Sequence, residues 1–571
     1  MCGIVGYAGN IETACGKPLE VCLQGLERLE YRGYDSAGVA LTAPGMDKVV
    51  VRKKAGRLKN LVGDIERKPM PLATVGIGHT RWATNGEPSD VNAHPHTSMD
   101  GKVAIIHNGI IENASQLRLD LQAEGYRFAS ATDTEVAAKL LGKIVDKIIA
   151  DEGKPDLFKA VCRMARMLEG AFTILATDCR QPDIVAGARH DSPLVVGLGE
   201  GENFLGSDVA AFVAYTKRAM EVGQDQAVCV SADKVIVTDF NGNVVENPKT
   251  YTVDWDASAA EKGGWDSFMD KEIHEDPAAV QRTLLGRFDT NGGITLDEVR
   301  IDEHDFKAID KIIVVACGTA SYAGQVAKYA IEHWVRIPVE IELAHEFRYR
   351  DPILTPRTLV VAISQSGETM DTLMALRHAR EQGSKVLAIC NTQGASIPRE
   401  SDAVLYTHAG PEVAVASTKA FVAQITAAYL LGLYLAQVKG AMFRDEIHQV
   451  LDSLKDMPRK IQWVLDTQPK TIQAAAERMV NANSFLFLGR HVGYPVALEG
   501  ALKLKEIAYT LTEGFAAGEL KHGPIALVDE GEPVVFIVPP QRGRNVLHAK
   551  VISGIEEVKA RGAYKIGRAH V

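Results

Sequence analysis

Short apolar runs separated by turns dominate the first 245 residues, and their length and spacing are those of β-strands. We predict strands at residues 73–78, 103–107, 172–177, 194–198 and 235–238. Helical periodicity of the apolar positions predicts helices at residues 18–29, 135–149 and 157–167. Helices interleaved with strands in this way indicate an α+β sandwich whose helices lie outside the sheets.

After residue 300 strands and helices alternate regularly, which is typical of an α/β doubly wound parallel sheet. Strands are predicted at residues 311–316, 339–343, 359–364, 385–390 and 403–407. A second round has strands at 485–489 and 533–538 and helices at 495–509 and 546–560, so we infer an internal duplication. Residues 560–565 correspond to 381–386, and no counterpart of residues 390–440 follows. The second lobe is therefore expected to be incomplete by roughly 50 residues.

Four regions follow from this pattern. The sandwich is placed at residues 1–245, a charged, glycine-broken connector that runs into a helix at 246–295, the first parallel lobe at 296–445 and the second at 446–571.

Composition adds what the protein is not expected to bind. The 571 residues are 46% hydrophobic and 24% charged, with a net charge of −10, which favours neither nucleic acid nor a membrane surface as partner. Residues 420–438 carry no charge but contain polar Gln424 and Gln437, so they predict a buried helix at a domain or subunit interface. Eight scattered cysteines without a C-x-x-C pair, and no secretory signal, indicate reduced thiols in the cytoplasm and no metal site.

Cys2 stands at the edge of the first apolar run. Removal of Met1 would leave its thiol beside a free α-amine with a pKa near ~7.7, which would accept the thiol proton without a histidine. The alternative is a buried cysteine in an ordinary first strand.

Three polar clusters elsewhere in the first half suit an amide substrate. Asn108 and Gly109 end a strand and would supply two donors to an oxyanion. Arg81 suits an α-carboxylate, and Asp133 suits an α-ammonium group. The alternatives are a surface salt bridge for Arg81 and a helix cap in the Thr132–Glu135 capping box for Asp133.

These residues resemble the class II, N-terminal-nucleophile glutamine amidotransferases, which have an αββα sandwich. The resemblance implies hydrolysis of glutamine by Cys2 as nucleophile and base, with Asn108 and Gly109 as the oxyanion hole. It further implies that Arg32 orders Cys2, that Arg81 and Asp133 bind glutamine, and that Trp82 gates the passage of ammonia. Asn85 departs from the family, which usually has histidine there.

In the second half, residues 364–369 lie between a buried strand and a helix and suit a phosphate. Ser364, Gln365, Ser366 and Thr369 supply its polar side chains, while Thr319 and Ser417 begin two other helices. Ligands bind at the carboxyl ends of such strands. The alternative is a set of well-capped helices.

The second round carries charged residues on an otherwise apolar helix. Glu499, Lys503 and Glu506 have the i, i+4, i+7 spacing of one helix face, which suits proton transfer beside a carbonyl. His522 lies in a loop bounded by glycine and proline and suits acid–base chemistry. The alternatives are a solvated ion-pair face and a loop histidine without a role.

These motifs resemble duplicated sugar isomerase (SIS) domains, and the two halves together resemble the isomerizing glutamine–fructose-6-phosphate aminotransferases. The resemblance implies glutamine and fructose 6-phosphate as substrates, glucosamine 6-phosphate as product, no cofactor and no metal. Residues 364–369 would hold the phosphate, with Thr319, Ser417 and Glu499 in the sugar site. Glu506 would move the proton between C1 and C2, Lys503 would assist, and His522 of a neighbouring subunit would open the ring. A homodimer through the isomerase domains is implied.

In that family a C-terminal tail carries the lysine that forms a Schiff base with the sugar, and residues 565–571 resemble no part of it. We therefore expect a truncated or misassembled reading frame, in which glutamine hydrolysis is retained and sugar amination is weak or absent. The alternatives are a glutaminase fused to a non-synthesising, sugar-phosphate-binding regulatory module, and a plain glutaminase.

Overall fold

The computed structural model describes residues 2–10, 17–30, 33–253, 262–289, 292–296, 299–541 and 546–570. The chain divides into two compact units, residues 1–263 and 264–571. The division falls inside the predicted connector 246–295. The finer boundaries of the predicted regions stay predictions.

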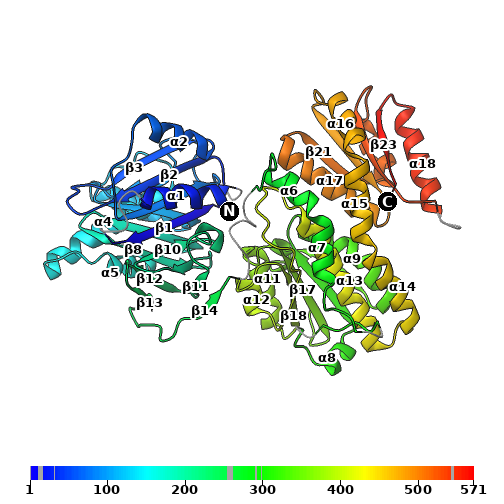
Figure 1. Ribbon diagram of the computed structural model, residues 1–571, viewed down its shortest axis with the longest axis horizontal. Coiled ribbons are helices and arrows are strands. Elements are labelled where there is room, and N and C mark those ends of the chain that lie inside the picture. The colour runs from blue at the N-terminus through cyan, green and yellow to red at the C-terminus, as the bar shows by residue number, and fades with distance from the viewer. Residues whose placement is uncertain are drawn as a thin grey trace. The chain divides into compact units, whose positions relative to one another are not determined.

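Unit 1 is a sandwich of two antiparallel sheets between two layers of helices (Figure 1). The first sheet has the order β14 (Thr250–Thr252), β11 (Arg218–Glu221), β9 (Val195–Leu198), β10 (Glu202–Gly206), β1 (Gly3–Gly9), β4 (Val75–Arg81), β2 (Ser36–Thr42) and β3 (Val50–Ala55). The second has the order β13 (Val235–Asp239), β12 (Gln226–Val230), β8 (Gln181–His190), β7 (Phe172–Asp178), β6 (Val103–Gly109) and β5 (His96–Thr97).

Three apolar layers hold this sandwich together. Ile4 and Ile77 of the first sheet meet Ile106 and Leu175 of the second in a fully buried core. The outer face of the first sheet packs against α1 (Lys17–Arg28) and α2 (Leu58–Arg67). The outer face of the second packs against α3 (Ala114–Ala123), α4 (Asp133–Glu152) and α5 (Leu157–Ala165). The predicted αββα sandwich is confirmed.

Unit 2 begins with α6 (Phe268–His274), α7 (Asp276–Leu284) and α8 (Glu303–Ala308) and contains two parallel sheets. The first has the order β16 (Val339–Leu343), β15 (Lys311–Ala316), β17 (Thr358–Ser364), β18 (Lys385–Cys390) and β19 (Ala403–Tyr406). Its helices are α9 (Thr319–Val335), α10 (Ala344–Phe347), α11 (Met370–Glu381), α12 (Ser396–Glu400) and α13 (Lys419–Lys439). Separate apolar clusters cover its two faces, as a doubly wound sheet requires.

The second sheet repeats the order of the first with one strand fewer among the described residues. It runs β21 (Leu511–Ala516), β20 (Ser484–Gly489), β22 (Pro533–Val538) and β23 (Tyr564–His570). Its helical elements are α17 (Gly493–Ala508), α18 (Val546–Lys559), η4 (Glu519–His522) and η5 (Pro524–Leu527), and α14 (Arg444–Lys455), α15 (Met457–Thr467) and α16 (Pro469–Arg478) precede it. Strand β23 starts at Tyr564, the residue expected to match Lys385 at the start of β18.

Helix α13 is, among the described helices, the one long and apolar enough to cross a membrane by length and composition alone. It packs against α9, and Leu430, Leu431 and Leu433 are buried in the core of unit 2. The predicted burial is confirmed, whereas an interface role for this helix stays a prediction.

Candidate active sites

The start of β1 lies beside the end of β4 in the first sheet of unit 1. Gly3 pairs with Thr80, and the Gly3 amide donates to Thr80 Oγ1 at 3.2 Å. This pairing brings Cys2 to the residue after β4, where the amide of Trp82 donates to Cys2 Sγ at 3.2 Å. The nucleophile predicted from the sequence is therefore held by main-chain geometry.

Burial raises the pKa of the Cys2 thiol, although the Trp82 hydrogen bond and Arg81 act in the opposite direction. A thiol with a raised pKa keeps its proton at neutral pH and needs a base before it becomes a nucleophile.

Asn108 reaches the same point from the second sheet. Its Nδ2 donates to the carbonyl oxygen of Cys2 at 2.8 Å, which leaves the second N–H of the amide group for a ligand. Gly109 follows with φ of +117°, and a Cβ there would lie 2.0 Å from the carbonyl oxygen of Ala171. Only glycine fits that turn at the strand end.

His79 orients this amide and was missed by the sequence analysis. Its Nε2 lies 3.0 Å from Asn108 Oδ1 and 2.9 Å from the carbonyl oxygen of His107. Burial lowers the pKa of His79 to about 3, so the ring is neutral at pH 7. Because both neighbours are acceptors, Nε2 carries the proton, which turns Asn108 Nδ2 toward Cys2.

Arg81 and Asp133 come to the same region from β4 and α4. The Arg81 guanidinium is 3% exposed and donates through Nη2 to the carbonyls of Asn85 and Gly86, whereas Nη1 is buried without a partner among the described atoms. Since Arg81 uses the backbone of Asn85, the departure at that side chain leaves this contact intact. Burial lowers the pKa of Arg81, and the neighbouring Cys2 and Asp133 act in the opposite direction, so the three groups lie near one another.

The alternative interpretation of Asp133, as the cap of helix α4, is wrong. Thr132 is the N-cap of α4, and its side chain accepts from the amide of Glu135 at 3.2 Å. Asp133 Oδ2 instead accepts from the amide of Ile111 at 3.0 Å, two residues beyond Gly109. The carboxylate thus fastens the loop after β6 to the start of α4.

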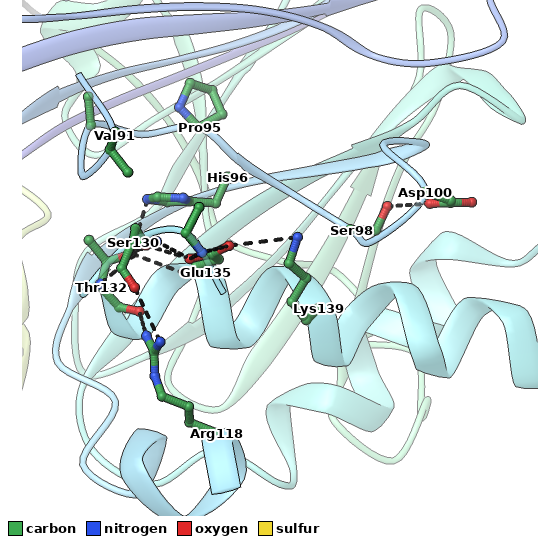
Figure 2. A network of polar contacts seen from close by, with 12 residues as sticks. Val91, Pro95, His96, Ser98, Asp100, Arg118, Ser130, Thr132, Glu135 and Lys139 are labelled. Carbon is green, nitrogen blue, oxygen red and sulfur yellow. Dashed lines mark hydrogen bonds and ion pairs between the residues drawn. The ribbon is translucent and has the colours of Figure 1, made fainter. Parts of the chain in front are cut away.

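Figure 2 shows the network that fixes this helix start. The Glu135 carboxylate accepts from the amide of Ser130 at 2.6 Å and forms an ion pair with Lys139 at 3.7 Å. Arg118 donates to the carbonyl of Thr132 at 2.8 Å, and His96 Nε2 lies 3.0 Å from Thr132 Oγ1. The polar groups around Asp133 are therefore held from several elements.

Of the remaining residues predicted in this unit, Trp82 is 43% exposed and its ring lies edge-on to Tyr34, with 5.3 Å between centroids. Arg32 lies outside the described residues.

In unit 2 the predicted phosphate loop connects β17 to α11 and is closed by its own hydroxyl groups. Ser364 Oγ lies 3.0 Å from Thr369 Oγ1 and accepts from the amide of Gly367 at 3.0 Å. Ser366 Oγ accepts from the amide of Glu368 at 3.2 Å. The Gln365 carbonyl accepts from the amide of Asn391 at 3.2 Å, which ties the loop to the end of β18.

One hydrogen bond joins the two lobes at this edge. Thr319, at the start of α9, donates to Glu499 Oε1 of α17 at 3.1 Å. Lys503 lies 3.6 Å from Glu499 and 2.6 Å from Glu506, so the predicted helix face is an ion-pair ladder. Burial raises the pKa of Glu499, with Thr319 and Lys503 acting in the opposite direction.

Ser417 lies in an acidic surrounding that the sequence did not reveal. Its hydroxyl donates to Glu412 at 2.9 Å, and Thr418 donates to Glu272 of α6. Lys419 is 2% exposed and forms an ion pair with Glu275. Burial together with Glu412 raises the pKa of Asp276 to about 7. Glu272 and Glu275 lie 146 and 144 residues from Thr418 and Lys419, so no local motif reveals these two contacts.

His522 ends η4 and is exposed. None of the hydrogen bonds or ion pairs described for this unit joins it to Glu499, Lys503 or Glu506.

Comparison with known proteins defines the class of this architecture. A glutamine amidotransferase domain model matches residues 79–214, and an SIS domain model matches residues 306–434 and 478–567. The molecule is a glutamine amidotransferase sandwich followed by duplicated SIS domains, as predicted.

Close relatives narrow this class further. The chain is 63% identical over 567 residues to the isomerizing glutamine–fructose-6-phosphate aminotransferase of Corynebacterium efficiens, and 59% identical over 566 residues to that of Streptomyces coelicolor. In both cases the match spans 99% of this chain and 90% of the relative. The C-terminal domain of glucosamine-fructose-6-phosphate aminotransferase from Francisella tularensis is 40% identical, with a TM-score of 0.51, over 53% of this chain and 83% of that one. The chain belongs to the isomerizing glutamine–fructose-6-phosphate aminotransferase family.

Proposed function

We propose that this protein hydrolyses glutamine and transfers the ammonia to fructose 6-phosphate with isomerisation, which yields glutamate and glucosamine 6-phosphate. The observation that carries the proposal is the meeting of three strand ends at Cys2, beside a buried N–H donor of Arg81 that has no partner among the described atoms. Family membership supports the choice of acceptor. We further propose that the protein acts in the cytoplasm as a homodimer.

The first half-reaction follows from the groups around Cys2. After removal of Met1, the α-amine of Cys2 takes the thiol proton, and Sγ attacks the side-chain amide carbon of glutamine. Asn108 Nδ2 and the Gly109 amide stabilise the oxyanion. The free Nη1 of Arg81 binds the α-carboxylate, and Asp133 binds the α-ammonium group. Ammonia leaves, and water hydrolyses the thioester to glutamate.

Two residues of this unit have supporting roles. Trp82, beside the nucleophile, gates the ammonia. Arg32, assigned by resemblance alone, orders Cys2.

The second half-reaction uses both lobes of unit 2. Ser364, Gln365, Ser366 and Thr369 hold the phosphate, where the start of α11 favours negative charge. Thr319, Ser417 and Glu499 line the sugar site.

Proton transfer in this half-reaction uses the charged ladder and the second subunit. Glu506 moves the proton between C1 and C2, and its ion pair with Lys503 positions its carboxylate. His522, exposed on η4, acts across the dimer on ring opening.

The test measures glutamate and glucosamine 6-phosphate together in one reaction of the 571-residue chain with both substrates. We expect the two products in equal amounts, because each ammonia released from glutamine is transferred to one sugar. Glutamate without glucosamine 6-phosphate would contradict the proposed transfer and favour a plain glutaminase. No glutamate from the wild-type chain would contradict the proposal for Cys2.

A binding measurement separates the aminotransferase lineage from a plain glutaminase. Isothermal titration with fructose 6-phosphate and with fructose is expected to give heat only for the phosphorylated sugar, and Thr369→Val should weaken it. Equal behaviour of the two sugars would contradict the phosphate loop. Binding of fructose 6-phosphate without any product would favour the regulatory module.

A further inference from the structure

Three metal-ligating side chains meet at the carboxyl edge of the first parallel sheet. Cys317 follows β15, His345 lies in α10 after β16, and Asp371 lies in the first turn of α11 after β17. One ligand atom of each lies within 4.8 Å of the others, and Cys317 Sγ is 3.9 Å from His345 Nδ1. Among the described residues this is the one such group of His, Cys and carboxylate side chains.

The spacing is close to that of a bound metal ion. Tetrahedral Zn²⁺ with sulfur at about 2.3 Å and nitrogen at about 2.1 Å places these two ligand atoms roughly 3.6 Å apart. The His345 side chain is 44% exposed and Asp371 is exposed, so small side-chain rotations close the remaining gap. The ligands come from three elements that the sheet itself aligns, so no backbone change is needed.

The local contacts of Cys317 leave its sulfur available. Besides His345, its polar side-chain neighbour is Thr372 Oγ1, also at 3.9 Å, which is too long to hold the thiol strongly. Burial raises the pKa of the Cys317 thiol, and the amides of Ala344 and His345, which face the sulfur, act in the opposite direction. His345 Nε2 lies 3.8 Å from the exposed Glu346 carboxylate, a distance too long for a hydrogen bond.

We propose that Cys317, His345 and Asp371 form a Zn²⁺ site with its fourth coordination position open. The ligand types select the ion, because thiolate and imidazole favour Zn²⁺ or Co²⁺ over Mg²⁺ and Ca²⁺. The sequence predicts no metal here, since these residues are separated by 28 and 26 positions and form no recognised spacing.

The site adjoins the proposed sugar site, so the binding of Zn²⁺ and the binding of the sugar phosphate would be coupled. This coupling rests on the proposed function. Cys317 is two residues before Thr319, and Asp371 is two residues after Thr369. Zn²⁺ that displaces the thiol proton raises the net charge of the cluster by one unit, which favours a nearby phosphate. By linkage each ligand then tightens the binding of the other by the same factor.

The test uses Co²⁺ as a spectroscopic substitute for Zn²⁺ in the untagged chain. Cys2→Ala is the parent, because a cysteine with a free α-amine chelates metals by itself. We expect one Co²⁺ per chain with a sulfur-to-cobalt charge-transfer band, and displacement of Co²⁺ by Zn²⁺. Cys317→Ser should abolish the band. His345→Ala, at a half-exposed side chain, should weaken binding by more than the 10- to 100-fold typical of an outer-shell loss.

Cys229→Ser is the matched control, since Cys229 is another partly exposed thiol and lies in unit 1. It should keep both the band and the affinity. A band that survives Cys317→Ser, or no band in the parent, would overturn the site, whatever the enzymatic activity of the chain. The linkage is tested separately by titrating fructose 6-phosphate with and without Zn²⁺, and an unchanged affinity would overturn that step alone.

Discussion

The proposed glutamine site and the proposed sugar site of this protein are built in opposite ways. Around Cys2 most contacts involve a main-chain atom, from three strand ends and one helix start of a single sandwich. Around Glu499 the contacts are between side chains, with Thr319 of the other lobe, 180 residues away, and with Lys503 of the same helix. The first site is fixed by the sheets before any ligand arrives, whereas the second depends on charged side chains that also hold the lobes together.

The two sites also differ in the charge of their buried groups. Burial keeps His79 neutral, which leaves Arg81 as the buried cation near Cys2. In unit 2, burial instead raises the pKa values of Glu499, Glu272 and Asp276. Mutations in the first site should therefore change activity with little effect on stability, whereas mutations in the second should change both.

The largest expected effect is that of Cys2→Ala on glutamate release. Loss of a nucleophile typically costs on the order of 10⁴- to 10⁶-fold in rate. Stability should change little, because the side chain contributes only its hydrogen bonds to Trp82. Cys179→Ala is the control with the opposite expectation, because this buried thiol donates to the Asp47 carbonyl oxygen. It should lower stability and leave the glutaminase rate unchanged. A rate loss below about tenfold for Cys2→Ala would contradict the role of this residue.

Asn108→Ala should lower kcat for glutamine by about 10²- to 10³-fold with a smaller change in KM, because an oxyanion donor acts mainly in the transition state. The matched variant is Asn113→Ala, which removes an amide that donates to the Met167 carbonyl at 2.9 Å on the same loop. Equal losses in the two variants, measured by steady-state glutamate release, would indicate a structural role for both.

The contact between lobes should be visible in a double-mutant cycle of Thr319→Val and Glu499→Gln. A hydrogen bond to a charged group contributes about 1.5–3 kcal/mol, and this coupling should appear in the free energy of unfolding of unit 2. Thr426→Val removes a hydroxyl that donates to the Val422 carbonyl, and its effect should simply add to that of Glu499→Gln. A coupling near zero for the first pair would mean that the lobes are held by packing alone.

A further effect is expected in the pH dependence of stability. The pKa of Asp276 is raised to about 7, so the folded chain keeps a proton that the unfolded chain releases between about pH 4 and 7. Stability therefore falls as pH rises through this window, by at most about 1.4 kcal/mol per pH unit. Asp276→Asn should flatten this part of the denaturation profile. The exposed Asp445→Asn should leave it unchanged, and identical profiles for all three chains would contradict the assignment.

The sequence predicts most of the fold because the elements that bury apolar residues show a pattern of apolar positions in their own sequence. Strand β17 and helix α13 begin and end within one residue of their predicted limits. The strand β21 was missed, since its Leu511 and Glu513 are exposed and leave no alternating pattern. The matching order of the two parallel sheets confirms the duplication inferred from the two rounds.

For the site, residues in a motif at a strand end were predictable and their partners were not. Arg81 and Asn108 follow visible strands, and sheet pairing brings them together as expected. His79 and Glu272 act through neighbours that only the tertiary structure supplies. The roles of the predicted site residues stay proposals until the variants are measured.

The hydrogen bond between Thr319 and Glu499 joins two residues that the ribosome makes at different times. The two residues are 180 positions apart. At about 5–20 residues per second, a ribosome delivers Glu499 roughly 10–40 s after Thr319. During that interval the phosphate loop and the whole first lobe have left the ribosome with their partner carboxylate still unmade. A nascent chain of this protein therefore finishes its glutamine site well before it completes the place where the nitrogen is used.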